Sequence, residues 1–153
     1  MIIGSGMTFH NLRGFGTNEN RAKLFDDWLY STLTSEKLSP KEKWKLLADW
    51  EKQSPQNSGR FARPREEHLL PIHVCFGSSF PKEKFEDNSQ IQVEYCRGFG
   101  MGSPLSCYIL TKALITAVKL NNTSHNRQLV ATQLNPIKIT LLFCYSKNKQ
   151  HMQ

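Results

Sequence analysis

The tetrapeptide that begins at Ser39 constrains the fold most strongly, because it specifies where a helix starts. Ser39 can cap the first turn, and Glu42 stands three residues later, which is the spacing of a capping box. Pro40 suits the first helical position, where no backbone N–H is required. The helix is expected to end near Ser54, because Pro55 disfavours helical geometry in the residue before it.

Two further helices are predicted, one on each side of this one. Residues 19–33 place apolar side chains on one face at helical spacing, with Trp28 beside them. These side chains are Ala22, Phe25, Leu29 and Leu33. Residues 55–65 are predicted to form a polar loop. Residues 66–79 are too apolar for a surface segment and are predicted to form the third helix, which tolerates Pro71 only near its start.

Strand patterns lie outside this helical region. Residues 91–95 alternate apolar and polar side chains, which indicates a half-buried strand. A second strand is predicted at 103–110, with Gly98 and Gly100 forming the turn between the two. Residues 1–3 resemble the end of a buried strand that runs into a Gly-Ser-Gly turn. The mixture of helices and strands favours an α/β fold.

The positive charge is concentrated at one end of the chain. The net charge is +7, yet residues 1–110 hold 14 Lys and Arg against 13 Asp and Glu, and residues 111–153 hold 6 against none. This acid-free tail also lacks helix caps and clear periodicity, so we expect an irregular, poorly ordered basic segment over 110–153. Its charges are diluted among polar residues without aromatic interleaving, so no nucleic-acid partner is expected.

The cysteines bear on the cellular compartment. Cys75, Cys96, Cys107 and Cys144 are scattered and form no CxxC pair, and the first residues do not resemble a secretory signal. Reduced thiols in a cytoplasmic protein are therefore expected. No stretch is long and apolar enough to span a membrane, so no membrane partner is expected.

Two histidines have a context that suggests chemistry. His10 follows a strand and a glycine-rich turn, where α/β sheets place ligands. His68 stands beside Glu66 and Glu67, although carboxylates at a helix start also have a purely structural explanation in the helix dipole. Because both histidines stand at the edge of an apolar element, folding could bring them into one site.

The remaining histidines are expected to have other roles. His73 lies on the apolar side of the predicted third helix and is expected to be structural. His125 and His151 lie in the basic tail and are expected to be surface residues.

Several blocks of sequence resemble one enzyme family. The blocks are Ile2-Ile3-Gly4-Ser5-Gly6, His10-Asn11-Leu12-Arg13, Phe25-Asp26-Asp27-Trp28-Leu29, Pro64, Glu67-His68-Leu69 with Pro71, and Gly100-Met101-Gly102-Ser103 with Leu105-Ser106 and Tyr108. In this order they resemble the C-terminal half of class III extradiol ring-cleavage dioxygenases, and most closely the DOPA dioxygenase-like branch of the LigB family. The similarity covers residues 1–109.

The resemblance implies the C-terminal part of an αβα catalytic domain with a non-haem metal site. The family uses Fe(II), and zinc is the alternative metal, to cleave a catechol such as DOPA with O₂. His10 and His68 would be metal ligands, and His10 is also the candidate acid–base residue. Asn11 and Glu67 would orient the two histidine side chains without binding the metal themselves. The oligomeric state is left open.

Two departures from the family pattern shape the expected function. The family's other metal-binding histidines lie in an N-terminal half without a counterpart here, so the chain is expected to be a fragment with feeble or no activity alone. Glu66 or Glu67 could supply a third ligand. Pro104 is also unexpected inside a central strand. The alternative is a non-catalytic remnant or binding module that keeps the scaffold and a partial metal site.

Overall fold

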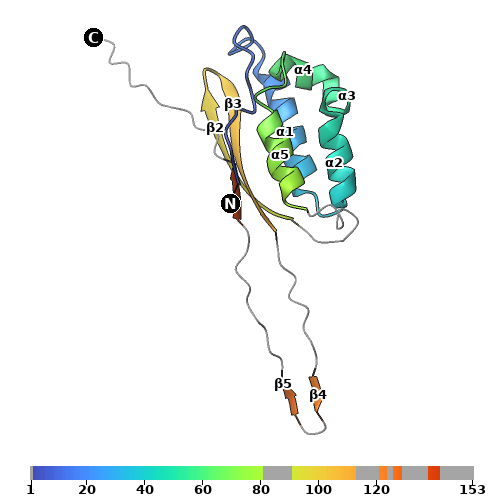
Figure 1. Cartoon of the computed structure of the whole chain (residues 1–153). Helices are drawn as coiled ribbons and strands as arrows, with labels where there is room; N and C mark the ends of the chain where they lie inside the picture. The colour runs from blue at the N-terminus through green and yellow to red at the C-terminus, as the bar shows by residue number, and fades with distance from the viewer. Residues whose placement is uncertain (1, 81–90, 113–120, 124–125, 129–137, 142–153) are drawn as a thin grey trace, which may run out of the picture.

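The computed structural model describes residues 2–80, 91–112, 121–123, 126–128 and 138–141 (Figure 1). These residues combine helices with a small, largely antiparallel sheet, so the predicted mixture of helix and strand is confirmed. None of the described helices is long and apolar enough to cross a membrane.

Helices α1 and α2 begin where the sequence predicts. Helix α1 spans Glu19–Thr34, and the side chain of Asn18 accepts a hydrogen bond from the backbone N–H of Arg21. Helix α2 spans Pro40–Ala48 and starts with the predicted capping box, in which Ser39 and Glu42 satisfy each other's backbone N–H groups. A break at Asp49 separates α2 from the short helix α3, Trp50–Gln53, so the single predicted helix is two.

The prediction of a loop over residues 55–65 was partly wrong. A 3₁₀ turn, η1, spans Pro55–Asn57, and helix α4 follows at Ser58–Ala62. The hydroxyl of Ser54 accepts a hydrogen bond from the backbone N–H of Gly59 at 2.9 Å, which stabilises the first turn of α4. Gly59 has no room for a side chain, because an added Cβ would lie 2.9 Å from the Trp50 ring. These contacts are made by side chains five and nine residues away, so the helix propensity of residues 58–62 does not reveal them.

The last helix is shorter than predicted. Helix α5 spans Leu70–Ser78, whereas the apolar pattern suggested a start at residue 66. Pro71 explains the difference, because proline fits the first turn of a helix and clashes in its interior. His68 therefore lies in the turn before α5, where the backbone N–H groups of Leu69 and Leu70 donate to the carbonyl oxygen of Glu66.

A long hairpin forms the centre of the sheet. Strand β2, Ile91–Gly100, pairs antiparallel with β3, Ser103–Lys112. The turn is Met101–Gly102, both with positive φ, so Gly98 and Gly100 belong to β2 and the prediction that they form the turn was wrong. Pro104 lies opposite Phe99, close to this turn.

Short strands extend this sheet, in the order β1-β6-β3-β2. Strand β1, Ile3–Gly4, is parallel to β6, Lys138–Leu141, and β6 is antiparallel to β3. Strands β4, Asn121–Thr123, and β5, Asn126–Gln128, form a separate two-stranded ribbon. Strand β3 crosses the predicted boundary at residue 109. The described helices lie on one face of the sheet, as Figure 1 shows.

A buried polar cluster fastens α1 to the hairpin. Asp26 is 1% exposed and accepts hydrogen bonds from the side chains of Tyr95 (3.2 Å), Arg97 (2.7 Å) and Ser106 (2.6 Å). Arg97 also pairs with Asp27. A buried carboxylate needs such donors, because an unpaired one would carry a large desolvation cost. The cluster therefore fixes the hairpin against α1, beside the apolar core.

Candidate functional site

The structure brings His10 and His68 together. Their ring centroids are 3.8 Å apart, the ring planes are tilted by 41°, and both side chains are half-buried. His10 comes from the loop after β1, and His68 comes from the turn before α5. The site thus forms where the Gly-Ser-Gly loop meets the segment between α4 and α5.

The loop that carries His10 is held by its neighbours in the sequence. Phe9 is buried, and its ring centroid lies 4.9 Å from that of Phe15 and 5.9 Å from that of Phe61. Thr8 is also buried, and its hydroxyl accepts a hydrogen bond from the Ser106 backbone N–H at 2.9 Å. Because Thr8 and Phe9 are both anchored, the position of His10 is fixed relative to the sheet and to α4.

Backbone hydrogen bonds join the two histidine segments. The backbone N–H of His10 donates to the carbonyl oxygen of Ala62 at 3.0 Å, and that of Met7 donates to the carbonyl oxygen of His68 at 3.3 Å. Each histidine segment is therefore fastened close to the other, which favours a preformed pair.

Asn11 and Glu67 occupy different positions around the pair. The side-chain amide of Asn11 donates to the carbonyl oxygen of Phe61 at 2.7 Å, so it orients the backbone rather than a ring. An added Cβ at Gly14 would lie 2.5 Å from the Asn11 amide nitrogen, so a larger residue at this position would displace the Asn11 side chain. Glu67 is exposed, and its charge acts on His10 through space.

The electrostatic environment favours the neutral form of His10. Burial lowers the pKa of His10, and the neighbouring His68 and Arg63 lower it further, whereas Glu67 acts in the opposite direction. A neutral imidazole has a free nitrogen lone pair, which can bind a metal ion or accept a proton. His10 therefore has the protonation state that either proposed role requires at neutral pH.

Arg63 is a site residue that sequence reasoning missed. Its side chain is fully buried, and Nη2 donates to the carbonyl oxygen of His68 at 3.5 Å. Nε and Nη1 have no hydrogen-bond partner within the described part of the chain. Burial lowers the pKa of this guanidinium, but arginine stays charged in proteins. Arg63 stood in a predicted polar loop, and no local signal indicated that it would be buried.

The histidine pair offers two nitrogen ligands to a metal ion. Within the residues that the structure describes, no group of three or more His, Cys, Asp or Glu side chains could hold a metal. Glu66, considered above as a third ligand, instead pairs with Arg60 at 3.2 Å. Within the described residues the histidine pair alone therefore does not complete a metal site.

His73 belongs to the scaffold, as predicted. Its ring nitrogens lie 3.1 Å from the carbonyl oxygen of Leu69 and 2.8 Å from that of Leu47. The second contact ties α5 to the C-terminal half of α2, so His73 does not take part in the His10–His68 site.

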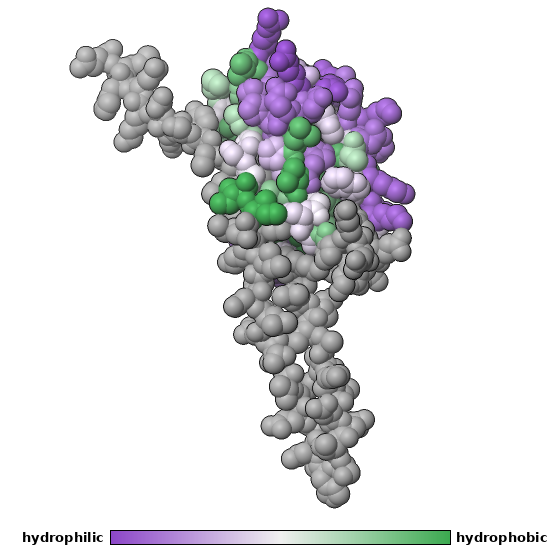
Figure 2. Space-filling model, viewed as in Figure 1, coloured by the Kyte–Doolittle hydropathy of each residue, from purple (hydrophilic) through white to green (hydrophobic). Residues whose placement is uncertain are grey.

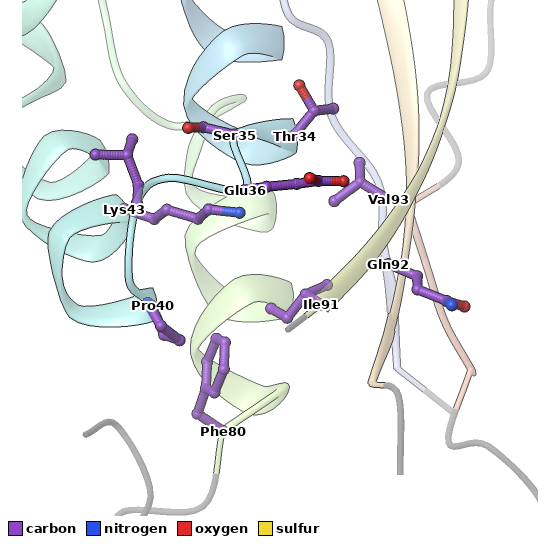
Figure 3. Close-up of a pocket in the computed structure, with 10 residues that line it drawn as sticks. Thr34, Ser35, Glu36, Pro40, Lys43, Phe80, Ile91, Gln92 and Val93 are labelled. Atoms are coloured by element: carbon purple, nitrogen blue, oxygen red, sulfur yellow. The ribbon is translucent and has the colours of Figure 1, made fainter. Parts of the chain in front are cut away.

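A cavity of about 350 Å³ lies away from the histidines (Figure 3). It is near the C-terminal end of α5, whereas His68 precedes the N-terminal end. The Lys43 amine, from α2, donates to the carbonyl oxygen of Leu33 at 2.8 Å, near the end of α1, and burial lowers its pKa. Lys43 therefore has a structural role, and the cavity is not where the histidine chemistry lies.

Comparisons with known proteins give no relative for this chain. No protein-family model, curated protein or solved structure matches it. The likeness to extradiol dioxygenases consequently stays a prediction from the sequence blocks.

Proposed function

We propose that this chain carries part of the metal site of an extradiol ring-cleavage dioxygenase. His10 and His68 would supply two of the nitrogen ligands for Fe(II), with zinc as the alternative metal. The observation that carries the proposal is the 3.8 Å separation of the two rings. They come from the two sequence blocks that most resemble the LigB family, and those blocks are far apart in the chain.

The side chains around the pair suit catechol chemistry. When bound, Fe(II) would supply open positions for the two catechol oxygens and for O₂. A neutral His10 can accept a proton from a catechol hydroxyl and return it later. Asn11 holds the His10 loop against Phe61, and Glu67 partly offsets the field of Arg63 at His10.

Two ligands predict weak metal binding and little turnover. Non-haem iron sites in oxygenases commonly use three protein ligands and leave the other positions open. A pair of imidazoles lacks one such ligand, which would have to come from outside the described residues. We therefore expect catechol to bind in a metal-dependent manner, with feeble oxygen consumption by the 153-residue chain.

Anaerobic titration of the Fe(II)-loaded chain with a catechol tests this proposal. We expect the near-ultraviolet absorption band of a metal-bound, deprotonated catechol, shifted to longer wavelength than that of the free catechol. His10→Ala and His68→Ala should both abolish this band. His125→Ala, outside the described residues, is the matched control and should retain the band. Oxygen uptake is then recorded after air is admitted.

The absorption band tests the dioxygenase proposal, and oxygen uptake tests the claim that the site is only partial. Absence of the band in the wild type would contradict the dioxygenase proposal. Rapid, stoichiometric oxygen uptake would instead contradict the claim that the site is only partial.

A specific observation supports a second candidate, a non-catalytic binding module. Strand β1 is at the edge of the sheet formed by the described residues, and Ile3 is 55% exposed. On α5, Leu70 and Val74 are 51% and 61% exposed and stand one helical turn apart. Figure 2 shows apolar side chains, in green, gathered over α5 and near the start of the chain. An exposed strand edge beside apolar side chains favours pairing with another chain.

The catechol titration also distinguishes this candidate. A binding module would give no metal-dependent band, and Val74→Glu would weaken its association with a partner while His68→Ala would not. The dioxygenase proposal predicts that His68→Ala abolishes the metal-dependent band and that Val74→Glu leaves it unchanged.

A further inference from the structure

Two cysteines that are separated in the sequence stand directly opposite each other in the hairpin. Cys96 of β2 is the register partner of Cys107 of β3. Directly opposed residues of an antiparallel pair project from the same face of the sheet. The opposed pairs on either side of it are Arg97 with Ser106 and Tyr95 with Tyr108. The side chains of Tyr95, Arg97 and Ser106 donate hydrogen bonds to Asp26 on α1.

Side-chain alternation places both thiols on the face away from α1. Because neighbouring residues of a strand point to opposite faces, Cys96 and Cys107 face away from the side where Tyr95 and Ser106 meet Asp26. The helices lie on that latter side (Figure 1). Cys96 is accordingly exposed and Cys107 is half-buried, so a small oxidant can reach the pair.

The hydrogen-bond pattern gives the spacing of the pair. The Ser106 backbone N–H donates to Thr8, away from β2, so Arg97 and Ser106 form a non-hydrogen-bonded pair. The adjacent pair, Cys96 and Cys107, is therefore of the hydrogen-bonded kind, with Cα atoms about 5.5 Å apart. Disulfides span Cα separations of about 4.4–6.8 Å, so the backbone already has a suitable distance.

The side chains would have to approach each other by about 1 Å or more. Opposed Cβ atoms are closest in non-hydrogen-bonded pairs, so in a hydrogen-bonded pair they lie toward about 5.5 Å, whereas a disulfide needs about 3.5–4.5 Å. A disulfide closed in this way is strained, and strained, exposed disulfides are the ones that reducing agents readily open.

We propose that Cys96 and Cys107 form a reversible redox site, a dithiol that a small-molecule disulfide oxidises to a cross-strand disulfide. The thiolate of the exposed Cys96 attacks glutathione disulfide and releases one glutathione. Cys107 then displaces the second glutathione, and the S–S bond closes. The two thiols lose two protons and two electrons in total, and the oxidant becomes two glutathione thiols. Either residue alone would retain a bound glutathione.

Intact-mass and peptide mass spectrometry of the folded chain after incubation with glutathione disulfide test this site. A Cys144→Ser background removes the cysteine outside the described residues, and buried Cys75 serves as an internal control. We expect the mass to fall by two hydrogen atoms, without a glutathione adduct. Trypsin cleaves after Arg97, so the link should join the peptide 85–97 to the peptide 98–112. Dithiothreitol should restore the original mass.

Two serine variants sharpen the result. Cys96→Ser and Cys107→Ser, each checked by circular dichroism, should lose the linked peptide, and Cys96→Ser should react several-fold more slowly because Cys107 is less exposed. The proposal is overturned if the Cys144→Ser chain, with Cys96 and Cys107 both present, accumulates separate glutathione adducts on these two cysteines. It is also overturned if its thiols stay reduced under conditions that oxidise a free dithiol. Both outcomes are read on the chain that keeps Cys96 and Cys107, so they do not depend on how the two serine variants fold.

Discussion

At the scale of single residues, the site is a pair of imidazoles next to a buried cation. His10 contacts His68, and the buried Arg63 donates a hydrogen bond to the carbonyl oxygen of His68. All these groups disfavour a positive charge on His10, and Glu67 opposes them only in part. A metal ion of the kind proposed would need both rings to be neutral, so its affinity for the pair would fall as the pH is lowered.

Removing His68 should move the titration of His10. In His68→Ala we expect the pKa of His10 to rise toward the ordinary value of 6.5, because the electrostatic effect of His68 on His10 is lost and the His10 ring becomes more exposed. The shift should be incomplete, since Arg63 remains. NMR titration of the ring protons in the metal-free chain measures it, and His125→Ala should leave it unchanged. A pKa that stays put or falls would contradict the electrostatic account.

The same residue should make stability depend on pH. The pKa of His10 is lower in the folded chain than in the unfolded one, so the unfolded state binds its proton first as the pH falls. As the pH falls below 6.5, the free energy of unfolding of the metal-free chain should decrease by the contribution of His10. This decrease should level off below the pKa that His10 has in the folded chain. His10→Asn should lack this component. Urea unfolding at about pH 7 and about pH 5 measures how far the free energy of unfolding falls in the wild-type chain and in His10→Asn. An equal fall in both chains would contradict the expected contribution of His10.

At the scale of elements, the start of α2 is fastened by side chains adjacent in the sequence. Ser39→Ala removes the acceptor for the first-turn N–H group and should lower the free energy of unfolding by about 1 kcal/mol. Ser31→Ala, at an exposed position inside α1, is the matched control and should have a much smaller effect. Chemical denaturation measures both. An equal effect of the two variants would mean that the capping box does not stabilise α2.

Local signals predicted some elements, and tertiary contacts determined the rest. The capping box and the period of α1 depend on neighbouring residues, so the sequence located both helices. Helix α4 depends on Ser54 and Trp50 packing around Gly59, which no local pattern reports. The candidate histidines could be selected by their sequence context. The burial of Arg63 and the opposition of Cys96 to Cys107 could not, because they follow from packing and strand register.

At the scale of the whole molecule, the Asp26 cluster joins the helical layer to the sheet. Arg97→Ala would leave a 1%-exposed carboxylate with fewer donors, so it should cost on the order of 2 kcal/mol of unfolding free energy. Lys23→Ala, which breaks only an exposed pair with Asp27, should change it by less than about 0.5 kcal/mol. Thermal and urea unfolding supply the comparison. Similar costs for both variants would show that the cluster is not what holds the layers together.

The central claim is that folding makes His10 and His68 one metal-binding unit. NMR observation of the five histidine rings during a Zn²⁺ titration tests it most directly. We expect the His10 and His68 signals to shift together and at lower Zn²⁺ concentration than those of His125 and His151. We also expect alanine at either position of the pair to remove the response at the other. Independent responses of the two rings, or saturation only where His125 also saturates, would contradict the claim.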